Sequence, residues 1–234
     1  MIKVRRALRR LSRTLRGIPS VGRVDWGDLR RTTPFSENFG YDRGDPVDRY
    51  YIEGYLAERS ALIRGHVLEV KNGDYTKRFG GERVTASDVL DIDESNPEAT
   101  IITDLNAAVE LPSNQFDCII LTQTLQFIWD CRAAITDLHR SLKPGGVLLV
   151  TVPVTPPLCA AASMFWSFTP RSLSRLLQEA FGGQGVEIHT LGNVLSVTAF
   201  LYGLSAKELT DPELDRCDPS YPLIIAATAR KIVD

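Results

Sequence analysis

The run LKPGGVLLVTVP at positions 142–153 constrains the fold of this chain more than any other segment. The residues before it, 130–142, repeat apolar side chains at helical spacing, and Pro144 cannot continue a helix. Gly145 and Gly146 supply the positive φ angles that a tight reversal needs. The apolar run 147–152 is typical of a strand buried on both faces, so the segment predicts a helix that turns into an interior parallel strand.

Further short apolar segments alternate with helical patterns along the chain. Helices are expected at about 48–62, 130–142 and 170–181. This alternation predicts an α/β fold with a doubly wound, seven-stranded, mostly parallel sheet that is Rossmann-like and has an antiparallel last strand. The expected strands are 67–70, 83–87, 99–103, 117–121, 147–152, 186–191 and 223–230.

Basic residues are concentrated at the amino terminus. Eight of the 27 Lys and Arg residues precede the first acidic residue, Asp25, so the rest of the chain carries 19 basic and 29 acidic groups. Apolar residues recur here at helical spacing, at Val4, Leu8, Leu11 and Leu15. We expect a basic arm or helix over 1–32 that packs on the body or on another subunit. Weak contact with a membrane surface and a transit-peptide role stay open, whereas the acidic body argues against a nucleic-acid partner.

Residues 33–234 are expected to form one α/β domain with two additions. The helix at 48–62 precedes the first strand as a cap. A helical insertion occupies about 192–220, between the last two strands, where a plain hairpin would need only a few residues. Because residues 193–204 are apolar on most faces of a helix, the insertion should cover the active-site mouth, the arm or a second subunit. A homodimer is therefore one expectation.

Composition argues against several classes of protein. No apolar stretch reaches about 18 residues, the length that a transmembrane helix needs. The basic amino terminus lacks the apolar core of a secretory signal. The four cysteines show no CxxC spacing and are expected to be free thiols in a reducing compartment, with no metal site. We therefore expect a cytoplasmic protein without a transmembrane segment.

Acidic residues stand where the first two strands are predicted to end. In an open α/β sheet, ligands bind beyond the carboxyl ends of the strands. Glu69 ends the first strand and Asp88 ends the second. A carboxylate at the second position can accept hydrogen bonds from both ribose hydroxyls of an adenosyl ligand. Asp91 and Asp93 compete with Asp88 for this role.

The third and fourth strands end in residues that suit the rest of such a ligand. Asp104 can accept from an adenine amine while Leu105 packs on the ring; the alternative is an ordinary turn residue beside a core residue. The fourth strand leads into Thr122 and Gln123, whose backbone and amide groups can contact an amino-acid moiety. All these residues precede the LKPGG run in chain order.

Together these motifs resemble the class I S-adenosylmethionine-dependent methyltransferases of the small-molecule, methyltransferase-11-like group. The resemblance covers residues 67–153 and includes the FDCII strand and the KPGG joint. It implies S-adenosylmethionine as cofactor, S-adenosylhomocysteine as product and a small-molecule or glycan acceptor. The cofactor-binding residues that it implies are Glu69, Val70, Lys71, Gly73, Asp88, Asp104, Leu105, Thr122 and Gln123, with Arg49 and Tyr50 from the segment that closes over the cofactor.

The turn after the first strand departs from the family pattern. That pattern is E-x-G-x-G-x-G, in which glycines let the backbone approach the ligand. This chain reads EVKNGDY from Glu69, so only Gly73 remains, and Lys71 and Tyr75 add bulk. We expect weaker cofactor binding or a different turn, and Asp74 or Lys71 can instead contact the methionine group. The same departure argues against a dinucleotide-binding dehydrogenase.

The expected function is methylation of a hydroxyl group on a sugar or a secondary metabolite. The phrases FGYDRGDPVDRYYIE and FWSFTPRSL resemble a bacterial subset associated with glycan or natural-product pathways. No catalytic base stands out, and the weak candidates are His189, Asp48 and Tyr50. Trp166 and Phe168 can wall an acceptor pocket. The alternative is a methyltransferase fold that binds or regulates without methyl transfer, or that uses the cofactor to assist a rearrangement.

Overall fold

A computed structural model describes residues 17–107, 111–158 and 164–232. The chain divides into two compact units, Met1–Pro34 and Phe35–Asp234. In the described part of the first unit, a 3-10 turn spans Gly27–Leu29, and the Asp25 carboxylate accepts the Gly27 amide at 3.0 Å. The helix predicted at the start of the arm falls in residues 1–16, outside the described residues.

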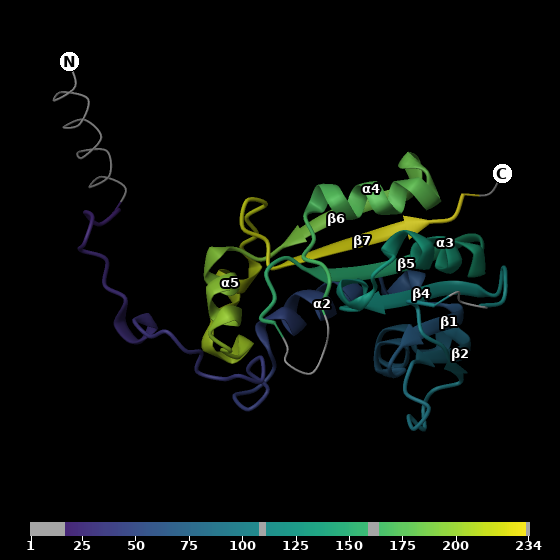
Figure 1. Ribbon diagram of the computed structural model, residues 1–234, viewed down its shortest axis with the longest axis horizontal. Coiled ribbons are helices and arrows are strands. Elements are labelled where there is room, and N and C mark those ends of the chain that lie inside the picture. Colours follow the sequence, from purple (N-terminus) through teal and green to yellow (C-terminus); the bar gives the residue numbers. More distant parts are fainter. Residues whose placement is uncertain (1–16, 108–110, 159–163, 233–234) are drawn as a thin grey trace, which may run out of the picture. The chain divides into compact units, whose positions relative to one another are not determined.

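One seven-stranded sheet forms the centre of the second unit (Figure 1). In chain order its strands are β1 (Gly65–Val70), β2 (Val84–Asp91), β3 (Ile101–Ile102), β4 (Phe116–Thr122), β5 (Leu142–Pro153), β6 (Val186–Leu191) and β7 (Ile224–Arg230). Across the sheet the order is β3-β2-β1-β4-β5-β7-β6. The first five strands pair in parallel, and β7 runs antiparallel to both β5 and β6. The predicted doubly wound, mostly parallel sheet with an antiparallel last strand is confirmed.

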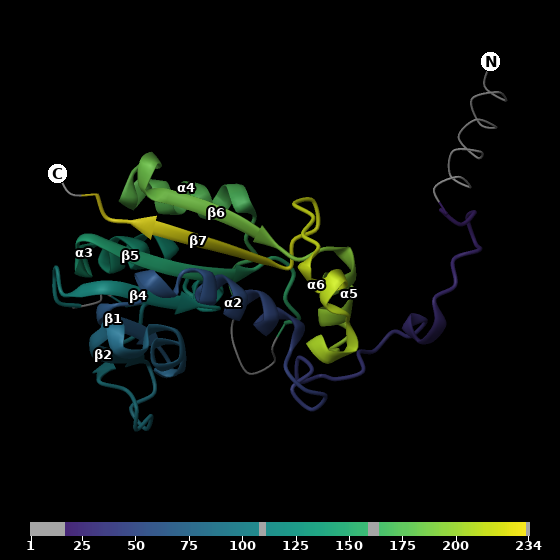
Figure 2. The same cartoon turned by 180° about the vertical axis from the view of Figure 1, so that it is seen from behind.

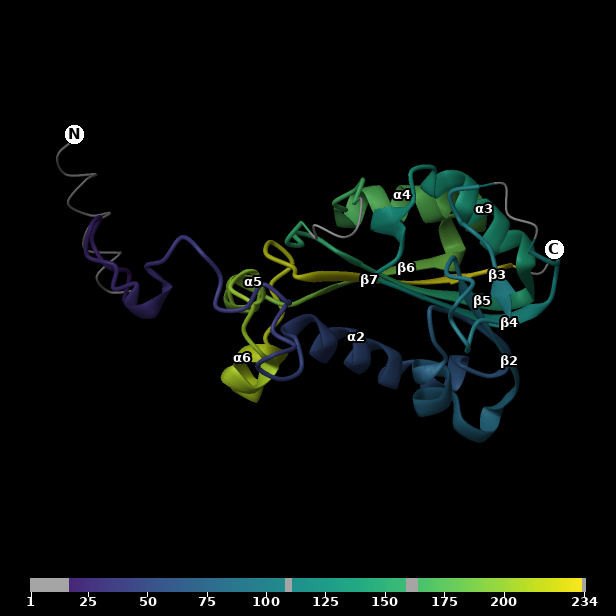
Figure 3. The same cartoon turned by 60° about the horizontal axis from the view of Figure 1, so that its bottom comes forward.

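Helices cover both faces of the sheet (Figure 3). α3 (Cys131–Ser141) and α4 (Pro170–Phe181) lie over one face, and α2 (Val47–Glu58) lies over the other. Successive residues of β5 over 147–150 alternate between the apolar layer under α3 and α4 and the apolar layer under α2. Because β5 buries both faces, its sequence is a continuous apolar run rather than an alternating one.

The start of β5 contains the predicted joint, with two differences. The strand begins at Leu142 rather than at residue 147, so the KPGG residues lie within it. Gly145 has a φ of 79°, in the left-handed region that glycine favours. Gly146 does not take a positive φ, so the prediction is wrong for that residue. A Cβ at Gly146 would lie 2.9 Å from the Lys143 carbonyl oxygen and 3.0 Å from that of Phe116. Gly146 is therefore required because β5 starts close to the backbone of β4.

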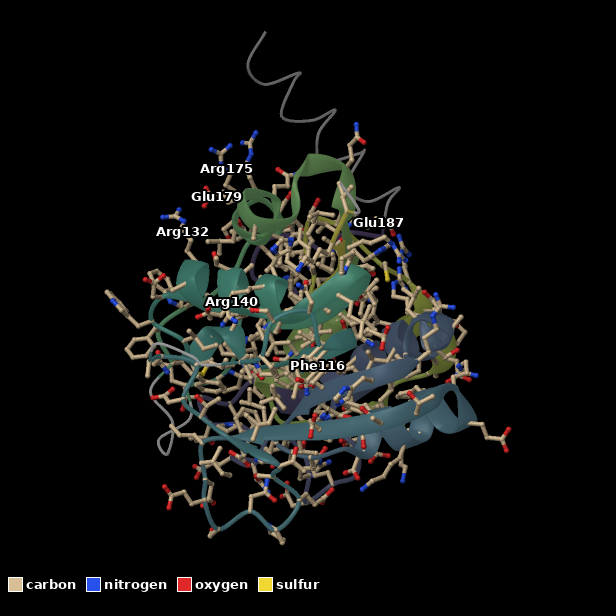
Figure 4. All side chains as sticks on the ribbon, turned by 90° about the vertical axis from the view of Figure 1, so that its right-hand side faces the viewer. Phe116, Arg132, Arg140, Arg175, Glu179 and Glu187 are labelled. Carbon is tan, nitrogen blue, oxygen red and sulfur yellow. The ribbon has the colours of Figure 1, made fainter. Side chains whose placement is uncertain are left out.

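The helices on the α3 and α4 face begin where the sequence predicts. The Asp130 side chain caps α3, and Thr169 forms a reciprocal capping box at the start of α4. On their outer surface Glu179 accepts from Arg132 at 2.6 Å and from Arg175 at 3.3 Å (Figure 4). The pair with Arg132 connects α3 to α4, and the pair with Arg175 lies within α4; surface ion pairs of this kind contribute little to stability.

The predicted helix over 48–62 is divided into α2 and a 3-10 turn, Ser60–Leu62. Pro46 is the N-cap residue of α2, so the helix begins one residue before the predicted start, and Asp48 lies in its first turn. α2 lies across the sheet (Figure 2). Ile52 and Leu56 on its inner face are fully buried.

The insertion between β6 and β7 packs on the amino end of α2. It contains two longer helical segments, α5 (Val194–Leu201) and α6 (Asp211–Asp215). Ser205 forms an isolated β-bridge with Pro46, and the Tyr51 hydroxyl donates to the Leu214 carbonyl at 2.9 Å. The insertion therefore covers the part of α2 that begins at the carboxyl edge of the sheet.

The second strand is longer than predicted. β2 pairs with β1 as far as Leu90, opposite Val70, and with β3 at Leu90 and Asp91. Asp91 is therefore the last residue of β2, and the prediction that the strand ends near Asp88 is wrong. Asp88 lies inside the strand, opposite Leu68. The length of β2 is determined by its two partners, which a local pattern does not reveal.

The expectations for membrane spans, cysteines and metal sites can be compared with the described residues. None of their helices is long and apolar enough to cross a membrane. Cys118 and Cys131 are buried free thiols and Cys217 is an exposed one, while Cys159 lies outside the described residues. Burial raises the pKa of the Cys118 thiol, as expected for an inert core cysteine. In the same part of the chain, no cluster of His, Cys, Asp or Glu side chains could hold a metal ion.

Candidate functional site

The carboxyl end of β1 carries a buried acid. Glu69 is only 2% exposed. Its two carboxylate oxygens accept the Tyr75 amide at 3.1 Å and the Thr76 amide at 2.7 Å. Burial raises the pKa of Glu69, and the two amide donors oppose that rise. Glu69 therefore fixes the backbone at the end of the turn over residues 71–75.

The turn after β1 has a left-handed residue that is not glycine. Lys71 has a φ of 78°, and its amide donates to the Leu90 carbonyl at 2.8 Å. A left-handed conformation costs a residue with a Cβ about 1–2 kcal/mol. The Lys71 side chain is exposed, and Gly73 has room around it, since an added Cβ would find its nearest neighbours at 3.6 Å. The turn therefore keeps a left-handed residue at position 71, although that residue is lysine.

Asp91 is the acid that lies beside this turn. Its Oδ1 accepts the Ile92 amide at 2.7 Å, and its Oδ2 accepts from Asn96 Nδ2 at 2.6 Å. The same Asn96 nitrogen donates to the Lys71 carbonyl at 2.6 Å. Asp91 is thus joined through one amide group to the backbone of the turn after β1.

Asp88, the residue predicted to bind ribose, is occupied elsewhere. One carboxylate oxygen lies 2.7 Å from His66 Nε2, and the other accepts from the Thr100 hydroxyl at 2.7 Å. His66 belongs to the neighbouring strand β1, and Thr100 directly precedes β3. The end of the second strand, where the prediction placed an acid, is the position of Asp91.

The residues after β3 form a turn and a link to the next loop. Asp104 Oδ1 accepts the Asn106 amide at 2.8 Å, as acids at the start of turns commonly do. Leu105 is 7% exposed and belongs to the apolar layer under α3 and α4. Asn106 Oδ1 accepts the Trp129 amide at 2.7 Å. The loop after β3 is therefore connected to the loop before α3.

The end of β4 is tied to the end of β5. Thr122 is the last residue of β4, and Gln123 leaves it with a φ of 49° and donates its amide to the Thr151 carbonyl at 2.9 Å. The carbonyl of Gln126 accepts the Phe165 amide at 2.8 Å, which fixes the loop after β5 across the end of β4. Gln126 is a lone polar residue within the apolar stretch LQFIW. Its side-chain Oε1 is buried and has no hydrogen-bond partner among the described residues.

The two aromatic residues predicted to wall an acceptor pocket lie in different environments. Phe168 is 4% exposed and belongs to the core. Trp166 is 40% exposed and stacks on Trp129, with ring centres 5.4 Å apart and planes at 24°. Trp166 and Trp129 therefore present an aromatic surface at the loops that follow β4 and β5.

Arg49 connects α2 with the turn after β1. Its Nε and Nη2 donate to the Tyr41 hydroxyl at 3.2 and 2.9 Å, and its Nη1 donates to the Tyr75 hydroxyl. The guanidinium also lies 5.9 Å from the centre of the Tyr75 ring. The bulk of Tyr75 is therefore directed toward α2. Sequence reasoning named Arg49 but missed Tyr41, which becomes a partner only when the segment before α2 folds back on it.

Tyr50 and His189 lie together on the other side of α2. Both line a cavity of about 340 Å³ between α2, β6 and α6. The Tyr50 hydroxyl donates to Asp215 at 2.6 Å, which raises the pKa of Tyr50 to about 12. His189 Nε2 lies 2.7 Å from a guanidinium nitrogen of Arg59, and burial together with that charge lowers the pKa of His189. The structure thus separates Tyr50 from Arg49, although the two are neighbours in sequence.

Part of the chain matches a known protein family. Residues 72–150 match the family described as methyltransferase domain. The matched segment begins in the turn after β1 and ends within β5. It therefore includes Asp91, Asp104 and Thr122, at the carboxyl ends of successive strands.

A named relative is similar to part of the chain. The chain is 33% identical over 107 residues to the ubiquinone/menaquinone biosynthesis C-methyltransferase UbiE of Hydrogenovibrio crunogenus. The alignment covers 44% of this chain and 39% of the relative. The similarity to this relative therefore extends over about two fifths of its length.

Solved structures share the fold over most of the second unit. An S-adenosylmethionine-dependent methyltransferase from Archaeoglobus fulgidus has a TM-score of 0.56 at 13% identity, covering 84% of this chain and all of its own. The [4+2]-cyclase SpnF has a TM-score of 0.55 at 21% identity, covering 86% of this chain and 87% of its own. At these identities the likeness concerns the fold. Together with the domain match, it confirms the resemblance to class I methyltransferases.

Proposed function

We propose that this chain, which carries a class I methyltransferase domain, transfers the methyl group of S-adenosylmethionine to a small-molecule acceptor. In such a step an acceptor atom attacks the methyl carbon while the bond from that carbon to sulfur breaks. Sulfur keeps the electron pair, which leaves S-adenosylhomocysteine, and the acceptor loses a proton. The protein's contribution is to bind and align the two reactants. Residues 33–234 form the catalytic domain in this proposal, and residues 1–32 form the basic arm.

The observation that carries this proposal is the link between Asp91 and the turn after β1. An adenosyl ligand at a switch point needs an acid for its ribose hydroxyls close to the backbone of the first turn. Asp91 and Lys71 share the side-chain amide of Asn96, with both contacts at 2.6 Å. We therefore assign the ribose role to Asp91 in place of Asp88.

The remaining cofactor residues keep the roles that the resemblance implies. Asp104 and Leu105 are assigned to the adenine, and Thr122 and Gln123 to the methionine end. Arg49 is assigned to the methionine carboxylate, because it is held against the turn by Tyr75. Tyr50 is left out of the cofactor site, since its hydroxyl is bonded to Asp215 on the other side of α2.

Calorimetric titration with S-adenosylmethionine and S-adenosylhomocysteine tests the assignment. We expect Asp91→Asn to weaken binding about 10- to 100-fold, the usual effect of losing hydrogen bonds to a charged group. Asp88→Asn is the matched control, because it removes the same charge from the same strand three residues earlier. Binding lost in the Asp88 variant but kept in the Asp91 variant would restore the original prediction. Absence of binding to the unmodified protein would refute the proposed function.

The acceptor we propose is a hydroxyl group on a sugar or a secondary metabolite. The exposed pair of Trp129 and Trp166 supports a ligand with a ring, because sugar and aromatic rings both stack on indole. A carbon acceptor is the second candidate, favoured by the C-methyltransferase relative. Incubating the protein with labelled S-adenosylmethionine and ring-bearing hydroxyl compounds tests both. A methoxy product supports the first candidate, whereas a carbon-bound methyl group supports the second.

A methyltransferase fold without methyl transfer is the alternative that Lys71 favours. Its left-handed backbone places a long side chain where the family has none. SpnF, which has this fold, is a [4+2]-cyclase. Tight binding of S-adenosylmethionine without transfer to any compound of the acceptor panel would favour this alternative.

We also propose that the protein acts in the cytoplasm as a homodimer formed through α5. Val194 and Leu201, seven positions apart on one helical stripe, are 58% and 41% exposed. An exposed apolar stripe of this kind is typical of a subunit contact. Light scattering over a concentration series should show a dimer that Val194→Glu weakens, and a monomer at every concentration would refute it.

A further inference from the structure

We propose that Asp48 accepts the ammonium group of the methionine part of the cofactor. With Arg49 on the carboxylate, the first turn of α2 would then recognise both charges of the amino-acid moiety. This inference rests on the proposed function, because it concerns the same cofactor site. It is drawn from the position of Asp48, from an unsatisfied carboxylate oxygen and from the neighbouring charge.

The position of Asp48 follows from the direction of α2. The helix leads through Ser60–Leu62 into Gly65, the first residue of β1, so its carboxyl end lies at the amino edge of the sheet. Its amino end therefore lies at the carboxyl edge, where the ligand site is expected (Figure 3). The contact of Arg49 with Tyr75, in the turn after β1, agrees with this placement.

Helical spacing directs Asp48 toward the sheet. Residues four and seven positions apart share a face of a helix, so Asp48 is on the stripe of Ile52 and Tyr55. Those two side chains are 0% and 3% exposed and belong to the apolar layer that contains Val67 of β1 and Ile120 of β4. Asp48 continues this inward stripe by one turn toward the carboxyl ends of β1 and β4.

One carboxylate oxygen of Asp48 lacks a hydrogen-bond partner among the described residues. This oxygen, Oδ1, is buried. Burial raises the pKa of Asp48, and the charge of Arg49 and the backbone amides of Asp48 and Arg49 oppose that rise. A buried acceptor left unsatisfied is costly, and most such groups in proteins find a donor. An ammonium ion supplies both a donor and the opposite charge.

Arg49 makes the arrangement complementary to an amino acid. Three of its five N–H groups donate to Tyr41 and Tyr75, which leaves two for an incoming carboxylate. An α-amino acid carries its ammonium and its carboxylate on the same carbon, so the two charges are a few bonds apart. Asp48 and Arg49 carry the two opposite charges at the same helix end. The contact of Arg49 with Tyr75 holds the pair beside the turn after β1.

A calorimetric test uses three ligands that differ in the charged groups of the amino-acid moiety. S-adenosylhomocysteine carries both charges, its decarboxylated form keeps only the amine, and methylthioadenosine lacks the whole amino-acid group. Asp48→Asn should weaken the first two about 10- to 100-fold, as expected for a hydrogen bond between charged groups, and should leave the third unchanged. Arg49→Gln should weaken S-adenosylhomocysteine but not its decarboxylated form. Asp45→Asn is the control, because Asp45 is exposed and lies three residues earlier.

The outcomes distinguish the inference from the proposed function. The inference is overturned if Asp48→Asn binds S-adenosylhomocysteine as tightly as the unmodified protein does. That result is expected if Asp48 serves only as a base toward the acceptor. An equal loss for all three ligands would also overturn it, since that result reports a damaged fold. If the unmodified protein binds none of the three ligands, the proposed function itself fails. Unchanged methylthioadenosine affinity shows that the adenosine half of the site is intact in the variant.

Discussion

The close contact at the start of β5 allows a stability prediction to be worked out from distances. Replacing Gly146 with Ala places a Cβ 2.9 Å from the Lys143 carbonyl oxygen and 3.0 Å from that of Phe116. Both atoms are backbone, so they can move only if the first residues of β5 shift away from β4. Overpacking of this kind costs about 1–3 kcal/mol, and the gain from a stiffer unfolded chain returns about 0.4–1 kcal/mol. We therefore expect Gly146→Ala to lower the free energy of unfolding by about 1–2 kcal/mol.

Urea unfolding followed by circular dichroism measures this difference. Gly183→Ala is the matched control, because an added Cβ there meets nothing within 4 Å and the residue does not have a positive φ. We expect that variant to be as stable as the unmodified protein or more stable by about 0.4–1 kcal/mol. The reasoning is refuted if Gly146→Ala unfolds at the same urea concentration as Gly183→Ala.

Two other predictions concern the turn after β1 and the environment of His189. Lys71 has a φ of 78°, so Lys71→Gly should change the free energy of unfolding by less than about 1 kcal/mol. The β-branched variant Lys71→Val should lower the free energy of unfolding by clearly more, because β-branched residues rarely adopt a positive φ. Thermal unfolding of both variants measures the difference. Burial and the charge of Arg59 lower the pKa of His189 below its ordinary 6.5, so in acid the unfolded chain binds a proton that the folded protein does not. Stability should therefore fall as the pH drops below about 6.5, and His189→Gln should reduce that fall; an identical pH dependence of the unfolding midpoint in both proteins would contradict this.

The elements with strong local signals were predictable from the sequence. The joint at 142–153 was found because proline ends a helix and glycine permits a reversal whatever the rest of the chain does. The start of α4 was found for a similar reason, since Thr169 caps its own helix through a side-chain hydrogen bond. The continuous apolar runs of β4 and β5 required burial on both faces, and the two apolar layers of the structure supply it.

The end of β2 could not be predicted from its own residues. The sequence offers Asp88, Asp91 and Asp93 within six positions, and each is compatible with a turn. Pairing of Leu90 with Val70 on one side and with Ile101 on the other extends the strand to Asp91. A strand ends where its partners stop offering hydrogen bonds, which is a property of the sheet.

By itself the sequence determined the order of strands and helices, the α/β fold and the presence of acids near the carboxyl ends of the strands. Periodicity, proline, glycine and capping residues act over a few positions, and a linear pattern records them completely. Only the tertiary structure decided that Arg49 contacts the turn after β1 while Tyr50 contacts Asp215. It also decided that one Asp48 oxygen has no partner in the described part of the chain. Neighbouring residues of a helix point about 100° apart, so their partners depend on which elements pack around that helix.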